Sequence, residues 1–412
     1  MAGFERRGGE LWGDGVPLSR AAERFSTPLY VYSRAAIEAA WGEYARAFAS
    51  VRHRVCYAVK ANGNGAILRL LAGLGAGADI VSGGELLAAL RAGFSPERIV
   101  FAGVGKTDEE LALGLEHGIG EFNAESEDEI ARLGQAAAAR GRVARISLRV
   151  NPDIDPRSHP YVSTGLREAK FGVDIARAPE ILRRARATPG VEVGGLQCHI
   201  GSQVTDLEPL AAAARDVAAL SRRLLAEGFS LRTIDLGGGL GVDYEGRGAP
   251  TAAALAARVL PEVRDLPLTL VIEPGRSLVA SAGVLLTRVL YVKEDRDKRF
   301  VIVDAGMNDL LRPALYQAYH RLELVRPRGR PSVVADVVGP VCETSDFLAR
   351  GREIERPEPG DLVAVRDVGA YGFVMASNYN MRPRAAEALI EDGEVRLVRR
   401  RETFDDLVRG EV

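Results

Sequence analysis

The sequence predicts an α/β protein with two domains. The first is a (β/α)8 TIM-type barrel over residues 36–280, and the second is an all-β domain, of β-sandwich or Greek-key barrel type, formed by residues 281–412 together with 1–35. Two observations carry this prediction. Short β-rich runs alternate with helical runs up to about residue 280, and beyond that point β-branched runs follow one another without long helices. The length of 412 residues is ample for two cores.

The first domain begins with helix-forming residues near 36 and then contains eight strand candidates. These are Arg54–Val59, Ala78–Val81, Arg98–Ala102, Ile119–Phe122, Arg145–Val150, Val193–Cys198, Leu231–Leu236 and Leu268–Ile272. Helices are predicted between them, among others over Ala66–Leu74, Glu85–Arg91, Asp108–His117, Glu127–Ala139 and Leu207–Ala226. Apolar strands that alternate with amphipathic helices pair in parallel, with both faces covered. Eight such repeats in roughly 245 residues fit the usual size of a closed barrel.

The second domain is predicted from runs of β-branched residues, which are separated by turns that contain Gly, Pro and Asp. The runs are Val284–Val292, Phe300–Asp304, Ser332–Val338 and Asp361–Val368. A hairpin is expected within Glu387–Arg399, around the turn Glu391-Asp392-Gly393. The early run Pro28–Tyr32 is expected to pair with these strands.

Composition excludes several classes of protein. The 54 basic and 56 acidic residues nearly cancel, to a net charge of −2, so bulk charge indicates neither nucleic acid nor a membrane surface as partner. Cys56, Cys198 and Cys342 are too scattered for a disulfide framework or a zinc site, and we expect no metal. The N-terminus lacks the apolar run of a signal peptide, and no stretch reaches the ~20 apolar residues of a membrane helix. We therefore expect a cytoplasmic protein.

Polar residues and glycines follow the predicted strands, at the barrel end where such folds hold their active sites. They are Lys60, Ser82, Gly103, Asn123, Asn151, His199, Gly237 and Glu273. A lysine behind the buried run Tyr57-Ala58-Val59 is placed for desolvation, which lowers an amine pKa and frees a nucleophile. The alternative for Lys60 is an ordinary solvated lysine, and polar strand ends are common in any barrel.

Two glycine-containing loops end the seventh and eighth strands. They read Asp235-Leu236-Gly237-Gly238-Gly239-Leu240-Gly241 and Glu273-Pro274-Gly275-Arg276, and loops at this place are a habitual phosphate site. A dinucleotide fingerprint is excluded because its last glycine falls on Val242. A P-loop ending at Gly105-Lys106-Thr107 is excluded because its first glycine falls on Val100. A tight turn remains the alternative to a phosphate loop.

A lysine, a phosphate loop and a carboxylate at one barrel mouth are the groups that pyridoxal 5'-phosphate (PLP) requires. The lysine bonds to the cofactor, and an acid, here Glu273, keeps the ring nitrogen protonated. His199 either stacks on the ring or is a core histidine. Cys342, beside Glu343 on a Gly/Pro-rich loop, is either a proton donor or a small buried residue.

The chain resembles the diaminopimelate decarboxylases, a family of barrel-type PLP enzymes related to ornithine decarboxylases and alanine racemases. The resemblance runs from about Thr27 to Arg384, through YAVKAN, GADIVSGGEL, RVNPDIDP, KFG, CHIGSQ, DLGGGLG, EPGR, DAGMNDLLRPALY, GPVCETSD and GAYGF. One departure is Gln197, at a position where the family often has histidine.

The resemblance implies a role for each matching residue. Lys60 would hold PLP, His199 would pack on its ring, and Glu273 would meet its nitrogen. Ser202, Gly238, Gly239, Gly275 and Arg276 would surround the phosphate, and Tyr371 would close the site beside it. Arg276, Arg312, Tyr316 and Tyr371 would line the substrate site, with the two arginines and Tyr316 on the distal carboxylate and Glu343 on the distal ammonium. Cys342 would protonate the carbanion.

The implied reaction is PLP-dependent decarboxylation of meso-2,6-diaminopimelate to L-lysine and CO2, the last step of lysine biosynthesis, in a homodimer with shared active sites. Ornithine, lysine or arginine are rival substrates, but they lack the second carboxylate that a distal Arg pair would bind. A non-catalytic PLP-binding homologue is a further alternative, against which Lys60 and Cys342 argue. A racemase is disfavoured because it needs a second acid/base on the opposite face.

Overall fold

The computed structural model describes residues 3–156, 164, 170–295 and 298–412. The chain divides into two compact units. The barrel unit comprises Trp41–Val242 and Ala249–Ser277. The sheet unit comprises Met1–Ala40, Leu278–Val412 and the short segment Asp243–Gly248, which lies between two barrel segments in sequence.

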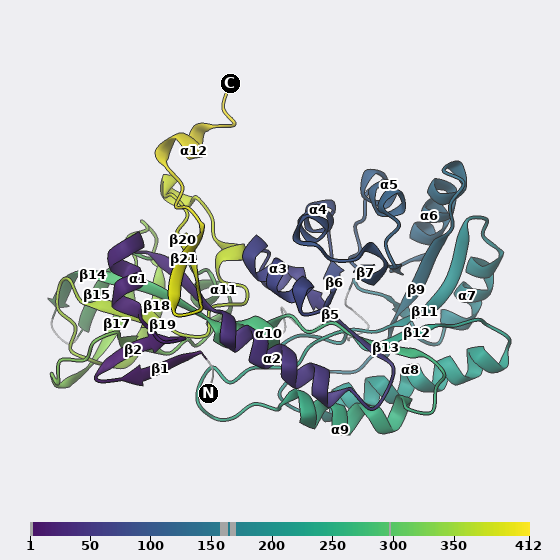
Figure 1. The fold of residues 1–412 in the computed structure, drawn as a ribbon, viewed down its shortest axis with the longest axis horizontal. Helices are drawn as coiled ribbons and strands as arrows, with labels where there is room; N and C mark the ends of the chain where they lie inside the picture. Colours follow the sequence, from purple (N-terminus) through teal and green to yellow (C-terminus); the bar gives the residue numbers. More distant parts are fainter. Residues whose placement is uncertain (1–2, 157–163, 165–169, 296–297) are drawn as a thin grey trace. The chain divides into compact units, whose positions relative to one another are not determined.

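Eight parallel strands close the barrel (Figure 1). They are β5 (His53–Ala58), β6 (Gly77–Ile80), β7 (Ile99–Phe101), β8 (Glu121–Ala124), β9 (Ala144–Asn151), β11 (Val191–Gln197), β12 (Thr233–Asp235) and β13 (Thr269–Ile272). Each pairs with the next in this order, and β13 pairs with β5, so the sheet has no free edge. The predicted barrel is confirmed, and all eight strand candidates are strands. The short β10 (Val173–Asp174) adds to β9.

Helices follow the barrel strands, and most helices that are consecutive in sequence contact one another. They are α3 (Gly65–Gly73), α4 (Gly83–Ala92), α5 (Asp108–His117), α6 (Glu127–Ala139), α7 (Ala178–Ala187), α8 (Glu208–Ala226) and α9 (Ala252–Val263), and α2 (Arg34–Ala47) precedes β5. Local chemistry fixes their starts: Ser82 caps α4, and Thr107 forms a capping box with Glu110 at α5. Helices α5 and α6 begin and end at the predicted residues.

The barrel strands carry more buried polar residues than a purely structural core needs. Val100 and Val271 pack with Cys56 in an apolar cluster. Alongside this cluster, the strands bury Asp79, Glu121, Asn123, Ser147, Gln197, Thr233 and Asp235. Because burying a charge is costly unless it is paired, this set marks the barrel interior as a functional region.

The sheet unit is built on the long strand β14 (Gly283–Asp295). One nine-stranded sheet joins it to β4 (Leu29–Ser33), β15 (Lys298–Val303), β16 (Leu322–Leu324), β17 (Ser332–Val338), β18 (Phe347–Glu355), β19 (Leu362–Val365), β20 (Ala386–Glu391) and β21 (Glu394–Arg399). A separate three-stranded sheet consists of β1 (Phe4–Arg7), β2 (Glu10–Gly13) and β3 (Val16–Pro17). The predicted sheet-rich region is confirmed, although it also contains α1 (Leu18–Phe25), α11 (Arg312–Tyr316) and α12 (Phe404–Val408).

Two local predictions for this unit are confirmed. Strand β4 lies antiparallel to β14 and parallel to β20, so the N-terminal run does join the later strands. The hairpin β20–β21 turns at Asp392 and Gly393, which both have positive φ, 52° and 76°. Two positive φ values are typical of the type I′ turn that Asp-Gly favours. Among the described residues, no helix combines the length and apolar character needed to span a membrane.

Candidate active site

Lys60 lies on a short 3-10 turn, Val59–Ala61, directly after β5. Its Nζ donates to Oδ2 of Asp79 at 2.7 Å, and Asp79 is fully buried in β6. The buried Asp79 carboxylate has no water as an alternative partner, whereas the Lys60 side chain keeps 37% of its surface exposed. Sequence reasoning missed Asp79. The sequence did contain a hint of this role, because Asp79 is an acidic residue within an otherwise apolar strand.

Glu273 is buried at the end of β13 and receives two amide hydrogen bonds. Asn123 Nδ2 donates to Oε1 at 3.2 Å, and Gln197 Nε2 donates to Oε2 at 3.3 Å. Burial raises the pKa of Glu273 well above its usual value, and the nearby carboxylates of Asp235 and Asp79 raise it further. Asn123 was predicted only as a polar strand end, and the roles of Gln197 and Asp235 were not foreseen.

His199 follows β11 and is partly buried. The backbone N–H of Gly238 donates to His199 Nδ1 at 3.2 Å, which leaves the ring hydrogen on Nε2 in the neutral form. Burial lowers the pKa of His199 well below its usual value, and the positive charges of Arg149 and Lys60 act in the same direction. His199 is therefore a neutral, fixed ring at neutral pH, which suits stacking.

The two predicted phosphate loops contain donors and tightly packed glycines. Arg276 begins the short helix α10 (Arg276–Val279), and its Nε and Nη2 donate to Ser202 Oγ at 3.2 and 3.0 Å. A Cβ at Gly238 would lie 2.2 Å from the carbonyl oxygen of Glu273, and one at Gly239 would lie 2.6 Å from that of Gly201. Only glycine fits at these two positions. Gly238 therefore has two roles: its N–H orients the ring of His199, and its lack of a side chain allows the two loops to approach each other.

Three buried polar atoms of this region have no hydrogen-bond partner among the residues that the structure describes: Asp79 Oδ1, Asn123 Oδ1 and Gln197 Oε1. Buried polar atoms are nearly always satisfied, so a cluster of exceptions indicates the place of a polar ligand. These groups fit the three parts of PLP. Lys60 matches its aldehyde, the glycine loops with Arg276 match its phosphate, and Glu273 matches its ring nitrogen.

Arg312 and Tyr316 lie at the two ends of α11 in the sheet unit. Arg312 is buried, with 5% of its surface exposed. Its Nε donates to His320 Nε2 at 3.2 Å, and its guanidinium lies over the ring of Tyr244, 5.0 Å from the ring centroid. Neither His320 nor Tyr244 was singled out from the sequence, because their proximity to Arg312 is purely tertiary.

Cys342 and Glu343 are exposed on the loop between β17 and β18. The backbone N–H of Cys342 donates to Asn380 Oδ1 at 2.8 Å. Hydrogen bonds from Ser345 and Tyr379 lower the pKa of Glu343, so this side chain is negatively charged at neutral pH. The exposure of Cys342 contradicts the alternative of a small buried residue.

Tyr371 is partly buried and has a φ of 55°. For a bulky residue a positive φ is rare and typical of constrained functional loops. The candidate residues thus fall into two sets. The barrel unit holds Lys60, His199, Ser202, Gly238, Gly239, Glu273, Gly275 and Arg276, and the sheet unit holds Arg312, Tyr316, Cys342, Glu343 and Tyr371.

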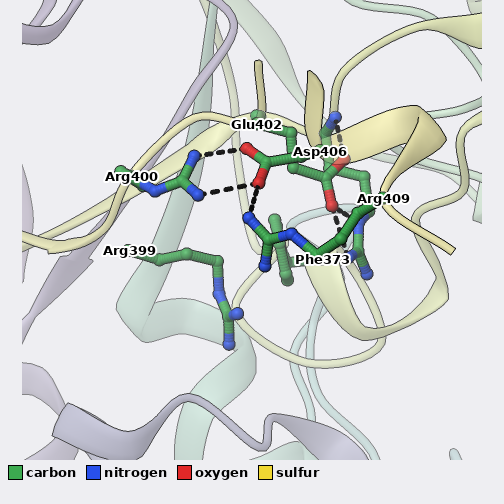
Figure 2. Close-up of a pocket in the computed structure, with 8 residues that line it drawn as sticks. Phe373, Arg399, Arg400, Glu402, Asp406 and Arg409 are labelled. Carbon is green, nitrogen blue, oxygen red and sulfur yellow. Dashed lines mark hydrogen bonds and ion pairs between the residues drawn. The ribbon is translucent and has the colours of Figure 1, made fainter. Parts of the chain in front are cut away.

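A separate pocket of about 320 Å³ lies in the sheet unit (Figure 2). Its lining consists of Phe373, Arg384, Ala385, Arg399, Arg400, Glu402, Asp406 and Arg409. The charges are paired: Arg384 with Glu402, Arg400 and Arg409 with Asp406, and Arg399 with the buried Glu387. We interpret this cluster as the structural anchor of the C-terminal segment.

Comparisons with known proteins point to the same cofactor. The family model described as pyridoxal-dependent decarboxylase, pyridoxal binding domain, matches residues 34–280. A diaminopimelate decarboxylase of Pseudomonas aeruginosa is 53% identical over 411 residues, covering 100% of this chain and 99% of that protein.

Two solved structures are similar over nearly the whole chain. Diaminopimelate decarboxylase from Helicobacter pylori, complexed with L-lysine, has a TM-score of 0.92 and 45% identity, and the match covers 95% of this chain and 98% of that one. The M. jannaschii enzyme, also with L-lysine, has a TM-score of 0.95 and 40% identity over 100% and 99% of the two chains. With matches that cover the barrel and the sheet unit alike, this chain belongs to the diaminopimelate decarboxylase family of PLP-dependent enzymes.

Proposed function

We propose that this protein decarboxylates meso-2,6-diaminopimelate to L-lysine and CO2 with PLP as cofactor, the last step of lysine biosynthesis, in the cytoplasm. The observation that carries the proposal is the juxtaposition of Lys60, Asp79 and Glu273 in the barrel of a chain that matches these decarboxylases over its full length. When bound, PLP supplies a protonated ring that accepts the electrons left behind when a carboxylate departs as CO2.

The barrel residues hold the cofactor. Lys60 Nζ would hold PLP covalently, and the neutral ring of His199 would lie against the cofactor. Arg276, Ser202 and the glycine loops would bind the phosphate, because N–H donors in a loop before a helix attract anions. Glu273 would hold a proton at the ring nitrogen, and the amide donors of Asn123 and Gln197 keep this carboxyl group oriented.

The sheet-unit residues recognise the substrate. Its distal end is an amino-acid head group, with a carboxylate for Arg312 and Tyr316 and an ammonium for Glu343. The depressed pKa of Glu343 keeps that side chain ionised for this contact. Tyr371 closes the site beside the phosphate, and Cys342 delivers a proton to the substrate carbon from which CO2 has left.

We also propose a homodimer in which the loop that carries Cys342 and Glu343 completes the site of the partner's barrel. Support comes from the exposure of both residues on this loop within a single chain. A second subunit that covered this loop would also exclude water from the proton donor.

The test is a CO2-release assay with meso-diaminopimelate, L-lysine and L-ornithine offered separately to the holoenzyme. Release from diaminopimelate alone is expected. Faster release from lysine or ornithine would overturn the substrate assignment, and no release from any of them would favour a non-catalytic homologue.

Lys60 is expected to carry the cofactor. Borohydride reduction followed by peptide mapping should label Lys60 and leave Lys106 unlabelled. Lys106 is the built-in control, because its buried Nζ already donates to the carbonyls of Gly103 and Asn123 and to Glu129. Label on Lys106 or Lys170 would refute the assignment.

A further inference from the structure

Two side chains from separate segments of the sheet unit, those of His320 and Tyr244, meet at Arg312. His320 accepts from Arg312 Nε at 3.2 Å, and Tyr244 lies under the guanidinium at 5.0 Å. The rings of Tyr244 and His320 also touch each other edge to face, with centroids 5.2 Å apart and an interplanar angle of 76°. Each member of this Arg312 cluster therefore contacts both of the others.

Both ring nitrogens of His320 are engaged. Nδ1 lies 2.9 Å from the carbonyl oxygen of Arg366, which can only accept, so Nδ1 carries the hydrogen. Nε2 faces a guanidinium, which can only donate, so Nε2 is the acceptor. His320 is fully buried, and these two bonds fix its neutral form and the direction of its ring.

Tyr244 is presented by a turn that is itself ordered. It lies in Asp243–Gly248, the short segment that groups with the sheet unit although barrel residues flank it in sequence. The side chain of Asp243 accepts hydrogen bonds from the backbone N–H groups of residues 245–248, at 2.7–3.2 Å. A carboxylate at the centre of a turn holds its backbone in one conformation, so the Tyr244 ring has a defined place.

We propose that His320 and Tyr244 are positioning residues, which hold the Arg312 guanidinium in the orientation that binds the distal carboxylate of the substrate. The inference rests on the proposed function, in which Arg312 makes that contact. An arginine side chain has many rotamers, and fixing it in advance removes an entropic cost from ligand binding.

The experiment compares matched substitutions in the holoenzyme. Asn at 320 can keep the donor to Arg366 but loses the acceptor for Arg312, whereas Gln can place its amide oxygen near the position of Nε2. Leu at 244 removes the aromatic face, and Phe keeps it. We expect His320→Asn and Tyr244→Leu to raise KM for diaminopimelate about 10-fold with kcat changed less than about threefold, and His320→Gln and Tyr244→Phe to recover most of the loss.

A binding measurement separates positioning from general damage. L-lysine keeps the distal carboxylate, and cadaverine is the same molecule without it. In calorimetric titrations the Asn and Leu variants should lose about 10-fold in affinity for L-lysine and little for cadaverine. Equal losses for the two ligands, equal effects of Asn and Gln at 320, or unchanged L-lysine binding would each overturn the inference.

The same data distinguish this inference from the proposed function. If the wild-type enzyme releases no CO2 from diaminopimelate, the proposed function fails, whatever the variants do. If it does release CO2 and the His320 and Tyr244 variants bind L-lysine as the wild type does, only the positioning role fails.

Discussion

At the scale of single residues, the barrel interior concentrates negative charge around one lysine. Asp79, Asp235 and Glu273 are all buried, and Lys60 is the cation that contacts one of them. Burial raises the pKa of Asp235 to about 7, and the negative charges of Asp79 and Glu121 act in the same direction. Burial, followed by the charges of Asp235 and Asp79, raises the pKa of Glu273 well above its usual value. Such a group of acids can share protons at neutral pH, which suits a site that must keep a bound ring nitrogen protonated.

Replacing Glu273 by Gln tests whether this acid keeps the ring nitrogen protonated. A neutral amide cannot stabilise a protonated ring nitrogen, so we expect the Glu273→Gln enzyme to keep its cofactor but to lose about 100-fold or more in kcat. The absorbance of the bound cofactor reports retention, and CO2 release reports turnover. Near-normal kcat in this variant would assign the role to another group.

At the scale of elements, the site depends on the close approach of the loops after β12 and β13. A Cβ at Gly238 would meet the Glu273 carbonyl at 2.2 Å, so Gly238→Ala must push the two loops apart. Because the same glycine supplies the N–H that fixes His199, cofactor affinity should fall by at least about 10-fold.

Gly105→Ala is the matched control, since a Cβ at Gly105 meets nothing within 4 Å. Titration of the apoenzyme with PLP measures both variants. Equal affinities for the two would show that the loops tolerate the displacement.

The C-terminal segment is held by the paired charges of Figure 2, and its stability should depend on pH. Burial opposes ionisation of Glu402, but hydrogen bonds from Arg384 and Asn378 outweigh it and lower the pKa to about 2. A depressed carboxyl pKa adds stability that is complete above the ordinary value of 4.5 and is lost as the pH falls towards 2.

We therefore expect Glu402→Gln to cost roughly 1–2 kcal/mol of unfolding free energy at pH 7. The difference from the wild type should shrink as the pH approaches 2. Denaturant unfolding at several pH values measures this, with exposed Glu353→Gln as the control that should change little. A difference that persists unchanged at low pH would contradict the electrostatic origin.

At the scale of the whole molecule, the candidate residues are divided between two units of one chain. If sites are shared across a dimer, a Lys60→Ala subunit and a Cys342→Ala subunit, each inactive alone, should complement each other when mixed. One of the two sites in each heterodimer would then hold both intact residues, which gives at best about half of the wild-type activity. Mass spectrometry verifies the heterodimer, and a verified but inactive heterodimer would place both residues of a site on one chain.

Most of the fold could be predicted because it follows from local patterns. The eight barrel strands are apolar runs that lie between helices, and Ser or Thr residues cap several of these helices at their N-termini. The β20–β21 hairpin follows from the turn sequence Asp392-Gly393. The short strand β10 and the inclusion of Asp243–Gly248 in the sheet unit lack such a pattern. Their places depend on contacts between residues far apart in sequence.

The sequence by itself determined the barrel, the sheet-rich region, the cofactor chemistry and the family, because strand periodicity, the glycine loops and the ordered motifs are written locally along the chain. Only the tertiary structure decided which side chains support those motifs. Asp79 reaches Lys60, Gln197 and Asn123 reach Glu273, and His320 and Tyr244 reach Arg312. A hydrogen bond or a ring contact depends on ångström distances across the fold, and those distances are set by the packing of all elements together rather than by any stretch of sequence.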